Sequence, residues 1–234
     1  MSLTALSVNF FVALFALIDP VGNVALFAAA TVGAHAAGRR VLAAYISLFS
    51  FVFLAFFFLS GLTLLKFFGI SLPAFRIAGG VLLFLLGLDM ARGGFVDAMA
   101  APASDGDPAP PHVYARQGFE RLVVPFAVPL LIGPGAISTA VIYASETRGF
   151  GLAGLGAGLG VIAAVSLTIV ISFSLSGLIS RALGRIGMTI VIRVLGLILC
   201  AMAVQIIIIG VAAATHGLIR HDTAAPYPSI PGDG

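Results

Sequence analysis

An aspartate, a proline, a glycine and an asparagine interrupt a long apolar run near the N-terminus, in the segment FALIDPVGNVALF at residues 15–27. A carboxylate is costly inside a bilayer, and a proline removes one hydrogen bond of a helix. Asp19 is a good helix N-cap, and Pro20 is a good first residue of a helix. The pattern therefore predicts that one half-helix ends and another begins here, with free N–H groups at mid-membrane depth.

A second apolar run is interrupted in a similar way, in LLIGPGAISTAVI at residues 130–142, where two glycines flank a proline. Helix N-termini have a partial positive charge and unpaired N–H donors, and the half-helices before them have unpaired carbonyls. Two such breaks near the midplane suit a small zwitterion, with its carboxylate on the N-termini and its ammonium on carbonyls or on Asp19. The predicted substrate-binding residues are Asp19, Pro20, Gly22, Asn23, Gly133, Pro134, Gly135 and Ser138.

Composition defines the class of protein that must position these residues. Of the 234 residues 60% are apolar and only 9% are charged, and the mean hydropathy is +1.16. These values predict an all-α protein with several membrane spans. The 12 Lys and Arg residues are scattered between apolar runs and form no basic stripe, so no nucleic-acid partner is expected.

The hydropathy pattern over windows of about 19 residues predicts six transmembrane helices, at 5–31, 41–65, 72–91, 121–145, 150–180 and 187–214. The first and fourth contain the breaks and are predicted to be discontinuous. A stretch rich in Pro, Ala, Gly and Asp lies between the third and fourth and predicts a linker that buries no core. The predicted organisation is a three-helix repeat at 1–92, a cytoplasmic linker at 93–118, a second inverted repeat at 119–214 and a flexible tail at 215–234.

The two halves repeat one order of features: a broken span, a long span, and a span entered by an arginine. These arginines are Arg76 and Arg193, and each is followed three residues later by a glycine, Gly79 or Gly196. Because each half has an odd number of spans, the second half must enter the membrane from the opposite side, which makes an inverted repeat. We expect a gating or structural role for Arg76 and Arg193, since an arginine at a span entry can reach the interface or pair with a carboxylate or a helix C-terminus.

Basic residues between the predicted spans are distributed unevenly. The positive-inside rule places the richer side in the cytoplasm and predicts both termini outside a bacterial or archaeal cytoplasmic (inner) membrane. The richer side has Arg39, Arg40, Arg92, Arg116, Arg121, Arg181 and Arg185, and the other has Lys66, Arg148 and Arg220.

Four segments resemble the MarC family of membrane proteins. They are DPVGN at 19–23, FRIAGGVLLFL at 75–85, PLLIGPGAIS at 129–138 and RVLGLILCAMAVQ at 193–205. The resemblance implies six spans arranged as inverted three-span repeats. It also implies, for members of the SnatA type, transport of glycine, alanine and similar small neutral amino acids. On this basis we expect a secondary transporter or exporter that works by alternating access.

Two other classes of function stay open. A channel or pore for a small polar solute would also use half-helices, although no selectivity ring is visible. An intramembrane enzyme would need a second acid or base, a nucleophile–His pair or metal ligands near Asp19, and none is evident. No metal site or cofactor is expected, because His35, His112, His216 and His221 lack ligand spacing. The coupling ion, proton or sodium, and a homo-oligomeric state are left open.

Overall fold

The structure is a computed structural model that describes residues 2–31, 34–93 and 110–215, and its regular elements in these ranges are all helical. This agrees with the predicted all-α class. The elements are α1 (Leu3–Ile18), α2 (Asn23–Ala30), α3 (Ala36–Phe67), α4 (Leu72–Arg92), α6 (Pro111–Leu122), the π-helix η1 (Val123–Leu131), α7 (Pro134–Thr147), the 3₁₀-helix η2 (Arg148–Phe150), α8 (Gly151–Ser174) and α9 (Ser176–Ala214).

Four stretches of the described chain are long and apolar enough to cross a membrane. The bent pair α1 and α2, whose axes differ by 45°, would make a fifth if it counts as one span. The third stretch joins α7, η2 and α8, with Gly151 at φ 58° between the last two. The four stretches are Ala36–Phe67, Leu72–Arg92, Pro134–Leu178 and Thr189–Ala214.

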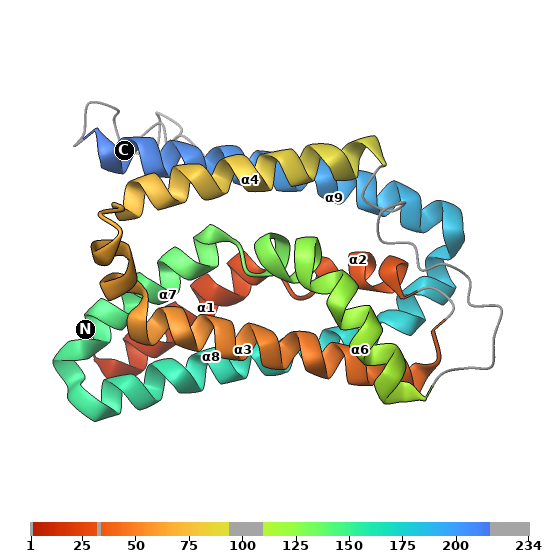
Figure 1. Ribbon diagram of the computed structural model, residues 1–234, viewed down its shortest axis with the longest axis horizontal. Coiled ribbons are helices and arrows are strands. Elements are labelled where there is room, and N and C mark those ends of the chain that lie inside the picture. Colours follow the sequence, from red (N-terminus) through yellow and green to blue (C-terminus); the bar gives the residue numbers. More distant parts are fainter. Residues whose placement is uncertain (1, 32–33, 94–109, 216–234) are drawn as a thin grey trace, which may run out of the picture.

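Both predicted interruptions are present. The first span region stops at Ile18 and resumes at Asn23. The second stops at Leu131 and resumes at Pro134, with Gly133 as the N-cap. Both lie near the middle of the long axis of the molecule, and α1 begins at the same end as α9 finishes (Figure 1).

The helices form two parts (Figure 1). Helix α4 and the Thr189–Ala214 part of α9 lie side by side along one edge, and we call them the α4–α9 pair. The first turn of α9 lies with the other helices, where Gly177 packs against Arg39 of α3. The remaining described helices form what we call the main bundle, in which α3 contacts α6, α7 and α8, and α1 contacts α7 and α8. The pair meets the main bundle chiefly at α2, η1 and α7, so the two broken regions lie between the two parts.

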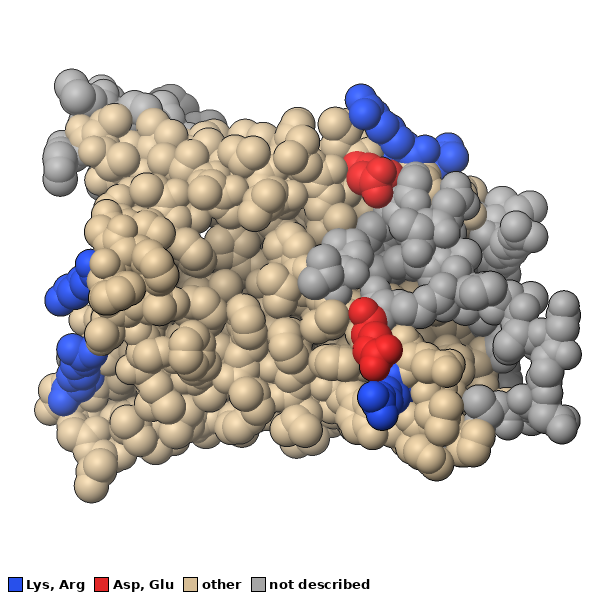
Figure 2. Space-filling model, viewed as in Figure 1, with Lys and Arg blue, Asp and Glu red and all other residues tan. Residues whose placement is uncertain are grey.

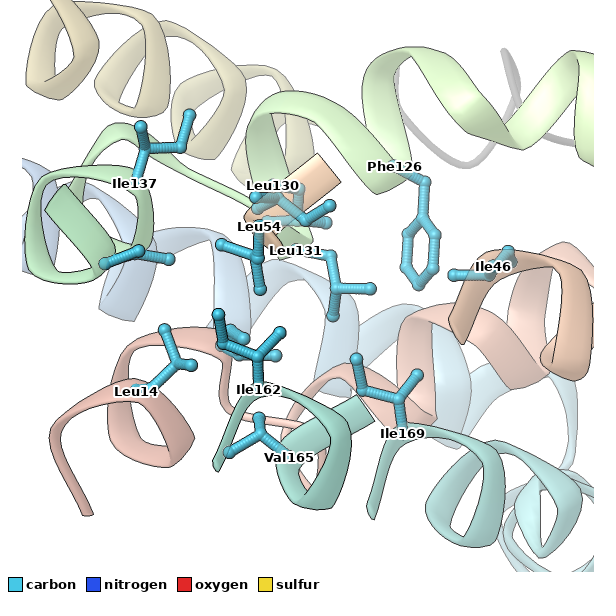
Figure 3. Packing of buried hydrophobic residues seen from close by; sticks show 14 of the residues in the cluster. Leu14, Ile46, Leu54, Phe126, Leu130, Leu131, Ile137, Ile162, Val165 and Ile169 are labelled. Atoms are coloured by element: carbon cyan, nitrogen blue, oxygen red, sulfur yellow. The ribbon is translucent and has the colours of Figure 1, made fainter. Parts of the chain in front are cut away.

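The largest cluster of buried apolar side chains belongs almost entirely to the main bundle. Of its described members, only Met90 and Ile192 come from the α4–α9 pair. Figure 3 shows Leu130 of η1 beside Leu54 of α3 in this cluster, with Ile162 of α8 close by. The broken region of η1 and α7 is therefore fixed in the centre of the core.

Glycines let the backbones of α4 and α9 approach closely. A Cβ at Gly87 would lie 2.8 Å from the carbonyl oxygen of Gly196, and a Cβ at Gly196 would lie 2.7 Å from the carbonyl oxygen of Gly87. The thiol of Cys200 donates to the carbonyl of Phe84 at 3.6 Å. Small residues at a helix interface allow this kind of packing in membranes.

The expected linker differs from the structure at its C-terminal end. Residues 111–118 form the first turns of α6, which packs against α3 and places Arg116 and Glu120 on its exposed face, 3.4 Å apart. The helix is stable here because its apolar face, including the buried Ala115 and Leu122, contacts the core. The division into repeats stays a prediction, and the expected tail lies outside the described residues except for Thr215.

Charged side chains gather at the two ends of the molecule on the face shown in Figure 2, and an apolar belt separates them. This distribution is typical of a protein that crosses a bilayer, because the hydrocarbon region excludes unpaired charges.

The close approach of α4 and α9 predicts how glycine substitutions affect stability. Gly196→Leu should lower the melting temperature in detergent, because overpacking costs about 1–3 kcal/mol or more. The matched control is Gly156→Leu on α8, where an added Cβ meets no atom within 4 Å. The control should melt like the wild type, and equal melting of the two variants would contradict the packing described here.

Candidate functional site

Asp19 forms the first break. It has φ 43° and ψ 63°, in the left-handed region that Asp and Asn tolerate better than other non-glycine residues. Its N–H donates to the carbonyl of Phe15 at 2.9 Å and so ends α1. Its Oδ1 accepts from the N–H of Gly22 at 3.0 Å, and its carbonyl accepts from the N–H of Asn23 at 3.1 Å. Asp19 thus joins the two half-helices through its own hydrogen bonds.

The expectation that Pro20 is the first residue of the second half-helix is wrong. Pro20 is buried within a turn, and α2 begins only at Asn23. The N-cap of α2 is Gly22 and not the predicted Asp19, which is the C-cap of α1. The physical reason is the left-handed conformation of Asp19, which redirects the chain before helical geometry resumes.

Gly22 and Asn23 complete this break. A Cβ at Gly22 would lie 2.1 Å from Oδ2 of Asp19, so only glycine lets the carboxylate fold back over the turn. Asn23 is 8% exposed, and its Nδ2 donates to the carbonyl of Ile18 at 2.8 Å. This bond satisfies one of the carbonyls that the end of α1 leaves free.

The second break begins α7 as the sequence predicts. Gly133 is the N-cap with φ −77° and ψ 169°, and Pro134 occupies the first turn. In this turn the N–H of Ile137 donates to the carbonyl of Gly133 at 3.1 Å, whereas helix geometry leaves the N–H groups of Gly135 and Ala136 without partners inside the helix. Ser138, one turn further on, is 1% exposed, and its Oγ has no hydrogen-bond partner within the described part of the chain. Unpaired donors therefore lie at the start of α7.

A small cavity of about 40 Å³ lies between the first break and the α4–α9 pair. This volume accepts water-sized molecules and is too small for a solute of several heavy atoms. Among the described residues that line it, Asp19 is the only ionisable one. The lining residues are Leu17, Asp19, Gly22, Asn23, Leu26, Met90, Leu130, Leu195, Ile198, Leu199 and Met202.

The structure groups only some of the predicted site residues around this cavity. Asp19, Gly22 and Asn23 line it, whereas Pro20 and the second-break residues are outside the lining set. The second break is one side chain away, because a Cβ at Gly135 would lie 3.3 Å from Cδ2 of Leu17, which itself lines the cavity. Gly133 lies near the carbonyl of Pro129, and Pro134 lies against Gly79.

Arg76 and Arg193 lie away from the cavity. Arg76 is half-buried, and its Cβ is 3.3 Å from the position of a Cβ at Gly210. Arg193 is exposed, and its guanidinium lies 3.4 Å from the position of a Cβ at Gly93, which ends α4. A cation is favoured near a helix C-terminus, which supports a structural role for Arg193.

The apolar wall of the cavity has no distinct signal in the sequence. Met90, Leu195, Leu199 and Met202 line it from the α4–α9 pair, opposite Asp19. These residues occur in apolar runs, where a side chain that faces a cavity and one that faces lipid have the same chemistry. Only the nearby glycines of the pair distinguish this region in the sequence.

Fold and site together define an integral membrane protein with a buried polar break between packed helices. The chain belongs to the MarC family, since the model of the MarC family integral membrane protein matches residues 4–215. This confirms the family resemblance seen in the sequence.

Related proteins occur in archaea and bacteria. A UPF0056 membrane protein of Methanocaldococcus jannaschii is 34% identical over 87% of this chain and 95% of its own length. A UPF0056 membrane protein of Aquifex aeolicus is 33% identical over 92% and 95%, and YhcE of Escherichia coli is 32% identical over 91% and 94%. These names state no substrate and no reaction. No solved structure matches the chain.

The buried hydrogen bond of Asn23 predicts the cost of losing it. Asn23→Leu keeps a similar volume but leaves the carbonyl of Ile18 unpaired, which should destabilise the protein by about 1–3 kcal/mol. Asn9→Leu is the control, because Asn9 is exposed on α1. Thermal melting in detergent measures both, and an unchanged melting temperature for Asn23→Leu would show that this bond does not stabilise the break.

Proposed function

We propose that this protein is a secondary transporter of small neutral amino acids, of the glycine and alanine class, that works by alternating access in the cytoplasmic membrane. The observation that supports it most is the small cavity at a helix break, whose described lining includes one carboxylate. Such a cavity can hold an ammonium group away from water, and it must open for a solute to enter or leave. Membership of the MarC family supports a membrane function without naming a substrate.

We assign six spans to the chain: α1 with α2, α3, α4, η1 with α7, α8, and α9. Contact between α7 and α8 supports a turn back at η2, which divides the long third stretch into two spans. Reciprocal contacts in the α4–α9 pair support the inverted repeat. Arg76 of α4 lies beside Gly210 of α9, and Arg193 of α9 lies beside Gly93 at the end of α4. Arg76 precedes Gly93 by the same number of residues as Arg193 precedes Gly210.

In this proposal the substrate ammonium binds the carboxylate of Asp19. One oxygen of Asp19 accepts the Gly22 bond, and a carboxylate has capacity for further donors. The substrate carboxylate binds the free N–H groups at the start of α7 and the Oγ of Ser138, after Leu17 moves aside. The apolar residues opposite Asp19 favour a small side chain. The coupling ion, proton or sodium, is not assigned.

The two alternatives have less support. A channel needs a continuous path when open, and a small cavity between two separate parts fits alternating access better. An intramembrane enzyme needs convergent reactive groups. Within the described ranges no cluster of three or more His, Cys, Asp or Glu residues is present, and Asp19 is the one ionisable residue of the cavity lining.

The role of Asp19 can be tested by two substitutions. Asp19→Asn keeps an oxygen for the N–H of Gly22 and tolerates the left-handed conformation, so alanine exchange in liposomes should persist. Asp19→Leu should abolish exchange, because it removes both the local bond and the polar contact to the substrate.

Coupling of alanine transport to proton movement is measured with the same two variants under a pH gradient. If Asp19 is the proton carrier, Asp19→Asn should fail to accumulate alanine although it still exchanges alanine, since an amide cannot release and rebind the proton. Folding is checked first by size-exclusion chromatography. Alanine and glycine fluxes in Asp19→Leu equal to those of the wild type would remove Asp19 from the proposed site.

The proposed orientation, with both termini outside, follows from the arginine distribution and has its own test. A single cysteine at Ser229, in a Cys200→Ser background, should react with a membrane-impermeant maleimide added to intact cells. The control is a cysteine at Gln117 on α6, which is exposed and predicted to be cytoplasmic and should react only after lysis. The reverse pattern of labelling would invert the topology.

A further inference from the structure

The two parts of the molecule differ in how their helices are joined. Within the α4–α9 pair, backbones meet at several points: a Cβ at Gly80 would lie 3.0 Å from the carbonyl of Ala203, and one at Gly210 would lie 3.1 Å from the carbonyl of Pro73. Together with the Gly87–Gly196 contact, these points extend along most of α4. Helices packed backbone to backbone at separate points along their length cannot slide past one another easily.

The pair and the main bundle are joined by apolar side chains instead. Pro134 of α7 packs against Gly79, and Ile206 packs against Gly135. Ala25 and Ala28 of α2 form a small apolar cluster with Val191 and Leu195 of α9, and Leu195 also packs against the main core. Apolar contacts have no fixed direction, so they can part and re-form at a shifted position.

The helices of the two parts also differ in how much of their length is buried. Of the most apolar part of each helix, 44% is buried in α3, 28% in α4 and 17% in the Thr189–Ala214 part of α9. Most of the surface of the pair therefore faces the lipid, where hydrocarbon replaces hydrocarbon when a helix moves. The Pro134–Leu178 stretch of the main bundle is 33% buried, so both helices of the pair are less buried than the long stretches of the main bundle.

The cavity lies on this same boundary. Its polar wall, with Asp19 and Asn23, belongs to the main bundle, and its apolar wall, with Met90 and Met202, belongs to the pair. A separation of the two parts enlarges the cavity without breaking the hydrogen bonds that hold the first break together, because those bonds lie within the main bundle.

We propose that α4 and the Thr189–Ala214 part of α9 move together as one rigid unit against the main bundle, and that this movement opens and closes the Asp19 cavity. The inference rests on the proposed transport function and adds which helices move. The main bundle stays intact through the core packing around η1 and α7.

Two cross-links in the full-length protein test this movement. Ala28→Cys with Val191→Cys, in a Cys200→Ser background, joins the pair to the main bundle. Phe84→Cys with the native Cys200 joins α4 to α9 within the pair and is the matched control. Each is linked in liposomes with a short bifunctional thiol reagent that dithiothreitol cleaves, and complete linking is checked by mass spectrometry.

Alanine exchange should be lost when Ala28→Cys and Val191→Cys are linked and should return on reduction. Linking Phe84→Cys to Cys200 should leave exchange unchanged. Exchange that persists in the first linked protein, or is lost in the second, overturns the proposal. If the first protein is inactive before linking, Ala25→Cys with Val191→Cys tests the same boundary.

A spin-label measurement separates this inference from the transport proposal, because it needs no substrate. Labels at Leu48 and Leu82, which are exposed on α3 and α4, report the distance between the two parts, and labels at Leu82 and Leu197 report the distance within the pair. We expect a broad or divided distance distribution for the first and a narrow one for the second, even if alanine and glycine are not substrates. Equally narrow distributions would show that the two parts do not move.

Discussion

Backbone groups at membrane depth must find hydrogen-bond partners inside the protein, and this constraint explains the structure around Asp19. A helix that stops within a bilayer leaves carbonyls and N–H groups that lipid cannot satisfy. Here Asp19 bonds the N–H of Gly22, and Asn23 bonds the carbonyl of Ile18. The polar residues that interrupt the helix thus also bond the backbone groups that the interruption leaves free, and they place one carboxylate beside a cavity.

The free backbone groups at the second break are accommodated in a different way. Gly133 and Pro134 begin α7 without a side-chain cap, and η1 before them adopts π-helical geometry inside the core. Irregular backbone is tolerated there because protein surrounds it on several sides, with α1, α3 and α4 in contact with α7. One break is closed by its own side chains, whereas the other retains unpaired donors, including the Oγ of Ser138. This asymmetry gives the two breaks different chemistry, an acceptor at Asp19 and donors at α7.

The two parts of the molecule on either side of these breaks are held together in different ways. The main bundle is held by a large buried core, and the α4–α9 pair is held by close backbone contact between glycines. The boundary between them is apolar and includes the cavity. The cavity of this integral membrane protein thus lies between two parts that are held together in different ways.

The sequence by itself determined the helical class, the two breaks and the family. Long apolar runs with few charges form helices in lipid, and Pro beside Gly in the middle of such a run removes helical hydrogen bonds and favours a break. Only the tertiary structure decided that Pro20 lies in a turn, that residues 111–118 are helical, and that Met90 and Met202 face Asp19. The reason is physical: an apolar side chain has the same chemistry against lipid, core or cavity, so its partner depends on how distant helices pack.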